Sequence, residues 1–162
     1  VDTLDKRRIT NATKALVGQV QQARSFAVLL NQPVTMEFRY TDGSNWCFGV
    51  TDFDTCDCSV AGSCSIARPA LPGVVKDPLD RIVVQSSSAE FPNVTLTGVA
   101  NQARLIFEPT RGVRTDALGP DVTWSFSSTT RPRGTNVRVN AIGRASACTS
   151  SGGPLFGGLG AC

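Results

Sequence analysis

Hydrophobic residues recur along one face of a helix through the first thirty positions of the chain. They stand three or four residues apart: Ile9, Ala12, Leu16, Val20, Ala23, Ala27 and Leu30. This spacing matches the 3.6-residue period of an α-helix and predicts one amphipathic helix from Asp2 to Leu30, roughly 43 Å long. Asp2 and Asp5 suit the positive end of the helix dipole, and Asn31 with Pro33 supplies a stop signal.

After Pro33 the pattern changes to short alternating runs between turn residues, and no second helical period follows. Runs rich in β-branched and aromatic residues, bounded by Gly, Pro and Asp, indicate strands. We expect strands at residues 34–40, 46–50, 82–85, 94–97, 103–107, 122–126 and 135–141. Asp42 and Gly43 predict a turn that joins the first two strands into a hairpin. Residues 59–78, 116–121 and 129–134 are predicted as loops. The fold class is therefore α+β, with one long helix packed on antiparallel sheet.

Aromatic side chains alternate within two of the predicted strands. Trp46 and Phe48 lie two residues apart, as do Trp124 and Phe126. Because side chains two apart on a strand share a face, these residues are predicted to be core aromatics rather than platforms for stacked bases.

The composition describes one globular domain with little support for an enzyme. The 162 residues are 41% hydrophobic and 18% charged, and the net charge of +3 is too small to indicate a nucleic-acid or membrane partner by itself. The chain contains no histidine, which removes Ser-His and Cys-His nucleophile pairs and the commonest zinc ligand. We expect no catalytic residue, no metal and no cofactor.

Six cysteines indicate disulfide bonds formed in an oxidising compartment. Four are clustered and two lie near the C-terminus: Cys47, Cys56, Cys58, Cys64, Cys148 and Cys162. Zinc bound by the first four is the competing interpretation, but eight, one and five residues separate them, whereas zinc ligands usually pair two to four residues apart. We expect the first four to pair among themselves, with three pairings open. Cys148 and Cys162 pair by elimination.

Three separated segments resemble, in the same order, the GspH/FimT family of pseudopilins and minor pilins. They are residues 23–27 (ARSFA) with 31–36 (NQPVTM), residues 105–112 (LIFEPTRG) and residues 137–145 (VRVNAIGRA). The resemblance implies a non-enzymatic filament subunit with a type IV pilin-like fold. The segments WCFG (46–49) and CDC (56–58) look like an insertion seen in some minor pilins, which favours the pilus over a secretion system.

The resemblance also implies a domain layout and partners. It implies one pilin-like domain over residues 1–162, in which 1–31 form the C-terminal half of the pilin helix, 33–147 an antiparallel β domain and 148–162 a disulfide-closed, Gly-rich tail. A leader and an apolar helix half that anchors in the bacterial inner membrane are expected to precede it. The partners would be other major and minor pilins, contacted through the helix, first at the inner membrane facing the periplasm and then in a cell-surface pilus.

The resemblance leaves three functions to weigh. We expect a minor pilin that acts as a structural, priming or tip subunit of a type IV pilus. The alternatives are a DNA-binding pilin for natural transformation and a minor pseudopilin of a type II secretion system.

Arginines near the C-terminus are the candidate nucleic-acid-binding residues. Four lie in one stretch of fourteen residues that contains no acid: Arg131, Arg133, Arg138 and Arg144. Guanidinium groups bind phosphate bidentately, so a patch of them would bind DNA with strong salt dependence. DNA-receptor pilins of this family carry Gly-Arg-x-Arg, whereas residues 143–146 here read GRAS and lack the second Arg. The alternative is a solvated strand face whose charges are balanced by acidic neighbouring subunits.

Two further groups have more than one interpretation. Asp52, Asp54 and Asp57 would suit calcium by their clustered carboxylates, but their spacing does not match an EF-hand, and a solvated, disulfide-pinned loop is favoured. Arg24 interrupts an apolar helix segment. It either extends along the helix edge to solvent or pairs with an acid of a neighbouring pilin helix.

Overall fold

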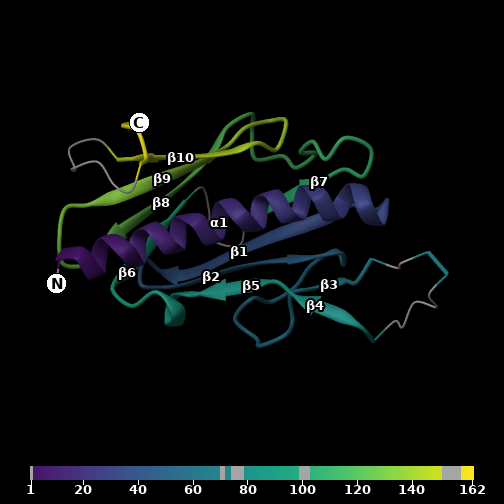
Figure 1. Ribbon diagram of the computed structural model, residues 1–162, viewed down its shortest axis with the longest axis horizontal. Coiled ribbons are helices and arrows are strands. Elements are labelled where there is room, and N and C mark those ends of the chain that lie inside the picture. The colour runs from purple at the N-terminus through teal and green to yellow at the C-terminus, as the bar shows by residue number, and fades with distance from the viewer. Residues whose placement is uncertain (1, 70–71, 74–78, 99–102, 151–157) are drawn as a thin grey trace.

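One helix, α1 (Asp2–Leu30), opens the chain and lies against two antiparallel sheets. The computed structural model describes residues 2–69, 72–73, 79–98, 103–150 and 158–162. In Figure 1 α1 runs along the length of the molecule, and its first turn lies at the same end as the C-terminus. The extent of α1 confirms the prediction made from the apolar spacing. No helix within the described residues is long and apolar enough to cross a membrane.

The end of α1 is capped by backbone geometry. Asn31 adopts a left-handed conformation with φ of 51°. The N–H of Asn31 donates to the carbonyl oxygen of Val28, and the N–H of Gln32 donates to that of Ala27, both at 3.3 Å. This pair of bonds is a Schellman motif, which satisfies carbonyls that the helix leaves unpaired. Pro33 follows and directs the chain into the first strand.

The strands that follow form two four-stranded sheets and a two-stranded ribbon. Their bounds are β1 (Val34–Asp42), β2 (Asn45–Thr51), β3 (Ser65–Ala67), β4 (Arg81–Val83), β5 (Gln85–Ser87), β6 (Val94–Thr97), β7 (Arg104–Phe107), β8 (Val122–Ser128), β9 (Gly134–Val139) and β10 (Ala145–Thr149), with a 3-10 turn η1 (Ser88–Glu90). The first sheet has the order β5-β2-β1-β7, the second sheet β10-β9-β8-β6, and β3 pairs with β4. Figure 1 shows the ribbon of β3 and β4 beside the first sheet, at the end away from both termini.

The core lies where α1 meets the inner faces of both sheets. The inward stripe of α1 is fully buried at Ile9, Ala12, Leu16, Val20, Ala23 and Ala27. The four aromatics predicted from strand alternation are buried as expected. Phe38 of β1 stacks on Trp124 of β8 with ring centroids 4.1 Å apart, so an aromatic pair joins the two sheets. The indole N–H of Trp46 also donates to the carbonyl oxygen of Val94 at 2.9 Å.

Three sequence predictions of local structure were incomplete. Residues 59–78, predicted as a loop, contain β3, and residues 70–71 and 74–78 of that loop lie outside the described part of the chain. The single strand predicted at 82–85 is divided into β4 and β5, which belong to different sheets. The segment 145–149 (ASACT) was not predicted as a strand because its small residues carry a weak β signal, yet it forms β10.

The C-terminal residues lie on the outer edge of β10. The N–H of Thr149 donates to the carbonyl oxygen of Gly160 at 2.8 Å, and the N–H of Cys162 donates to that of Thr149 at 3.0 Å. A disulfide joins Cys148 to Cys162. These bonds cover an edge that would otherwise offer unpaired backbone groups to another chain. The predicted tail also includes residues 151–157, which lie outside the described residues.

Candidate functional site

A disulfide-pinned loop, residues 52–64, covers part of the outer face of the first sheet. Cys47 of β2 is bonded to Cys58, and Cys56 is bonded to Cys64, which is one of the three pairings left open by the sequence. All four of these cysteines are buried. The loop has few apolar side chains of its own, so the two crosslinks supply the constraint that a hydrophobic core would otherwise give.

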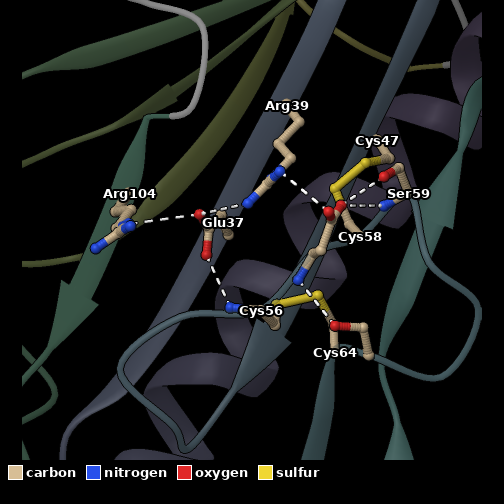
Figure 2. A network of polar contacts seen from close by, with 10 residues as sticks. Glu37, Arg39, Cys47, Cys56, Cys58, Ser59, Cys64 and Arg104 are labelled. Atoms are coloured by element: carbon tan, nitrogen blue, oxygen red, sulfur yellow. Dashed lines mark hydrogen bonds and ion pairs between the residues drawn. A yellow bond between two sulfur atoms is a disulfide. The ribbon is translucent and has the colours of Figure 1, made fainter.

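Under this loop lies a fully buried carboxylate, Glu37. It projects from β1 on the face opposite to its core neighbours Met36 and Phe38, and it is covered by the pinned loop. Figure 2 shows Glu37 between Arg39 and Arg104, with one carboxylate oxygen 3.7 Å and 3.4 Å from their guanidinium nitrogens. The other oxygen accepts a hydrogen bond from the N–H of Cys56 at 2.9 Å. The buried acid therefore anchors the loop to two strands.

Arg39 connects the same network to the tip of the loop. Its Nη1 donates to Oδ2 of Asp57 at 3.1 Å. The hydroxyl of Ser59 donates to the Asp57 carboxylate, and this bond, followed by those from the Ser59 N–H and the charge of Arg39, holds the pKa of Asp57 below its ordinary value. The Asp57 carboxylate therefore stays ionised to a lower pH than an unperturbed aspartate.

The three aspartates of the acidic segment do not come together in one cluster. Asp52 accepts hydrogen bonds from Arg81, from the side chain of Gln32 at 3.2 Å and from the N–H of Ala67 at 3.1 Å. Asp57 accepts hydrogen bonds from Arg39 and Ser59, while Asp54 is exposed. Among the described residues no group of three acids or cysteines could hold a metal ion. The carboxylates of Asp52 and Asp57 act as structural hydrogen-bond acceptors.

The four candidate arginines do not come together in one cluster. Arg131 and Arg133 lie in the turn before β9, Arg138 lies on β9, and Arg144 follows the turn after it. Because β9 advances about 3.3 Å per residue, its six residues separate the two turns by roughly 17 Å. Any anionic ligand that contacts all four would have to extend along the strand.

The outer face of the second sheet is rich in hydroxyl and amide groups. Outward positions on its four strands include Thr95, Thr97, Thr123, Ser125, Ser127, Asn136, Arg138 and Ser146. Arg138 stands between Thr123 and Ser146 in the strand register, and it forms no ion pair with the described residues. This face is polar, and its four strands contain Arg138 and no acid.

A second stripe of α1, the outer stripe, is left uncovered by both sheets. Its members again stand three or four residues apart: Leu4, Arg7, Asn11, Lys14, Gly18, Gln21, Ser25 and Val28. All are exposed except Gly18, which is half-buried, and a methyl group placed on Gly18 would meet no atom within 4 Å. The stripe contains two cations and no acid, so it offers a partner helix a basic, partly apolar surface.

Arg24 lies beside this stripe and is held by the β domain. Its Nε donates to the carbonyl oxygen of Gly112 at 3.1 Å. This contact holds the side chain at the helix edge, and an ion pair with a neighbouring helix stays a prediction. Its Nη groups form no ion pair with the described residues.

Sequence reasoning missed the acid at the centre of the buried network. Glu37 stands at an outward strand position, where alternation predicts exposure, and its register partner Arg104 belongs to a strand much later in the chain. A glutamate surrounded by apolar residues in a strand is a weak signal by itself. Only the loop that covers Glu37 makes it a buried site, and that loop has no periodic pattern.

These features define a class of protein. A long helix that buries one stripe on antiparallel sheets, leaves the other stripe bare and adds a disulfide-pinned loop is a pilin-like filament subunit. The family model described as Type II transport protein GspH matches residues 12–143, and the chain belongs to this family. The family comprises minor pilins and pseudopilins, which are structural, non-enzymatic proteins typically anchored in a membrane and then assembled into filaments with other pilins.

A solved structure shares the fold. A crystal structure of the type IV minor pilin FimU from Pseudomonas aeruginosa has a TM-score of 0.50 and 18% sequence identity, covering 86% of this chain and 87% of FimU. A second crystal form of FimU has a TM-score of 0.47 and 19% identity, over 85% of this chain and 90% of FimU. Among curated proteins, no sequence matches the chain significantly.

Proposed function

We propose that the chain is a minor pilin, a structural subunit that primes or tips a type IV pilus and joins it by packing its helix against other pilins. The observation that carries this proposal is the pair of stripes on α1. One stripe is buried by the chain itself, and the other repeats the same helical spacing on the bare side. A bare helical stripe of this length is what a partner helix would cover.

The chemistry of the outer stripe indicates the kind of neighbour. Gly18 lacks a side chain and so permits close approach of a second backbone near the middle of α1. Arg7 and Lys14 precede it along the stripe and favour a neighbour that presents acids. We expect the helix to supply the assembly contact, while the pinned loop and the second sheet remain on the surface of the filament.

A photo-crosslinking experiment tests the proposal. A benzophenone amino acid replaces Lys14 in the full-length subunit, in the bacterium that produces it, and crosslinked peptides are identified by mass spectrometry after irradiation. We expect peptides from the helix of another pilin. The control places the same probe at Thr123, on the outer face of the second sheet. A Lys14 probe that captures no filament subunit would contradict the proposal.

The same experiment separates the pilus from a type II secretion system. The description of the matching family model favours the secretion system, whereas FimU, which shares the fold, is a type IV minor pilin. Capture of a major pilin supports the pilus. Capture of a secretion pseudopilin places the subunit in the other machine.

A DNA-binding role is the second candidate, favoured by Arg138 on a sheet whose four strands contain no acid. Phosphate contacts release counterions, so binding weakens steeply as the salt concentration rises. Each lost contact reduces the steepness of log K against log salt concentration by about one. We expect Arg138→Gln to lower this slope in a gel-shift titration, and Arg131→Gln, Arg133→Gln and Arg144→Gln to do the same. Absence of binding at low salt would remove this candidate.

A further inference from the structure

The last three turns of α1 and the loop after β7 border an open groove. It has a volume of about 580 Å³. Its lining consists of Gln21, Arg24, Ser25, Val28, Leu29 and Arg111. Val28 and Leu29 are 48% and 66% exposed. Val28 stands in the outer stripe and Leu29 beside it, and two large apolar side chains left bare together favour a contact surface over a solvated one.

The wall of the groove is fixed before any partner arrives. Arg24 is bonded to Gly112, and both Gly112 and Gly143 adopt left-handed conformations with φ of 66° and 78°. A Cβ atom on Gly143 would lie 2.9 Å from the carbonyl oxygen of Gly112 and 3.2 Å from Cδ of Arg24. The helix, the loop and the β9–β10 turn are therefore in close contact, and a preformed wall lowers the ordering cost of binding.

Positive charge reaches the groove from both of its elements. Arg24 comes from α1, and no carboxylate of the described residues pairs with it. Arg111 comes from the loop, is 77% exposed and lies 3.9 Å from Glu108. The Glu108 carboxylate already accepts hydrogen bonds from the N–H groups of Thr110 and Arg111. Both guanidinium groups can therefore donate to an incoming carboxylate.

We infer that this groove binds a segment of a neighbouring filament subunit in which an aspartate or glutamate stands next to an apolar side chain. The carboxylate pairs with Arg24 and Arg111, and the apolar neighbour covers Val28 and Leu29. The inference rests on the proposed function, because it takes the partner to be a filament subunit. It goes further by naming the site and the side-chain chemistry of the partner segment. A phosphate polymer would satisfy the arginines but leave the apolar floor bare.

The test places the benzophenone probe at Leu29 of the full-length subunit in the producing bacterium. We expect a crosslink to a pilin peptide that contains an acid beside an apolar residue. Arg111→Glu should lower the crosslink yield about tenfold, because like charges then face each other at a partly desolvated contact. Changing the identified partner acid to Lys in the Arg111→Glu background should restore the yield. Arg138→Glu, an equal charge change on the second sheet, is the matched control and should leave the yield unchanged.

The Lys14 probe separates the two proposals. Crosslinks from Lys14 but none from Leu29 would overturn the groove and leave the filament role standing. A captured peptide without an acid, or equal yields with Arg111→Glu and Arg138→Glu, would also overturn it. Failure of both probes would remove the filament role and this inference with it. Thermal unfolding of each variant establishes that lost crosslinking does not reflect loss of folding.

Discussion

Arg114 and Asp116 form a buried ion pair that joins the two sheets. Their side chains are 2% and 3% exposed. Nε of Arg114 donates to Oδ2 of Asp116 at 3.0 Å, and Nη1 donates to the carbonyl oxygen of Val139 in β9 at 3.1 Å. Asp116 accepts a hydrogen bond from the N–H of Ile106 in β7 at 3.2 Å. A strand of each four-stranded sheet is thus bonded to one member of the pair.

Breaking this pair from one side should be costly. Arg114→Met leaves the Asp116 carboxylate buried without its cation, and we expect a loss of about 3–5 kcal/mol in the free energy of unfolding, measured with urea. Arg111→Met, at an exposed position, should change it by less than about 0.5 kcal/mol. The double change Arg114→Met/Asp116→Leu should recover much of the loss. Equal effects of the two single arginine changes would contradict the structural role of the pair.

Asp116 should also govern part of the acid sensitivity. Burial by itself would raise the pKa of Asp116, but the hydrogen bonds from Arg114, Ile106 and Leu118 and the charge of Arg114 outweigh it and lower the pKa below 3.8. A lowered pKa in the folded state stabilises the protein above the unfolded value, and this stabilisation is lost as the pH falls through the folded pKa. We expect the difference in Tm between the native chain and Asp116→Asn to be constant near neutral pH and to narrow below about pH 4. Asp121→Asn, at an exposed site, is the control and should show no such narrowing.

The spacing of apolar residues and the presence of turn-forming residues explain which parts of the fold could be predicted. The inward stripe of α1 and the alternation in β1 and β8 are properties of consecutive residues, so the sequence displays them directly. The contact between Glu37 and Arg104 depends instead on the pairing of β1 with β7, in which these two residues stand directly opposite each other. Strand partners far apart in the chain leave no local pattern, and so the buried network was not predicted.

The four candidate arginines illustrate a second kind of error, in which residues close in sequence lie far apart in space. Arg131 and Arg144 are close in sequence, but an extended strand separates them in space. Sequence proximity predicts spatial proximity in a helix or a turn and fails along a strand. The positive charge of this region could be predicted, whereas its distribution over an elongated face required the structure.

Glu37 should hold the pinned loop in place through its charge. In Glu37→Gln the side chain keeps its shape but loses its attraction to Arg39 and Arg104. Because both arginines are partly exposed, we expect a moderate loss of about 1–3 kcal/mol in the free energy of unfolding. Hydrogen exchange of the Cys56 amide, bonded to Glu37, should become faster. Asp54→Asn, on the exposed part of the same loop, should leave that exchange rate unchanged, and equal rates in the two variants would contradict this role.

The disulfides should differ in how much they stabilise the folded protein, for reasons unrelated to loop length. Unreduced, denatured protein should contain no free thiol. Cys148 and Cys162 close the longer interval, 14 residues against 8 for Cys56 and Cys64. The chain-entropy model therefore gives the terminal bond the larger effect, about 3 kcal/mol. We expect the reverse, since both Cys56 and Cys64 are buried and replacing them with Ala also removes packing. Comparison of urea midpoints for the two double-Ala variants decides between loop entropy and packing.

Gly143 should be the glycine at which a single methyl group does most harm to the groove. In Gly143→Ala the new Cβ would lie 2.9 Å from the carbonyl oxygen of Gly112 and from Cε1 of Phe107 while φ stays near 78°. Strain at positive φ and overpacking together should cost about 2–4 kcal/mol. Gly18→Ala is the control, because the added methyl group meets no atom and a helix interior gains about 0.5–1 kcal/mol from Ala. Opposite signs in thermal unfolding are expected. Similar small effects in the two variants would mean that the turn after β9 adjusts easily to the added methyl group. The wall that holds Arg24 would then not be preformed, and the partner would have to shape the groove.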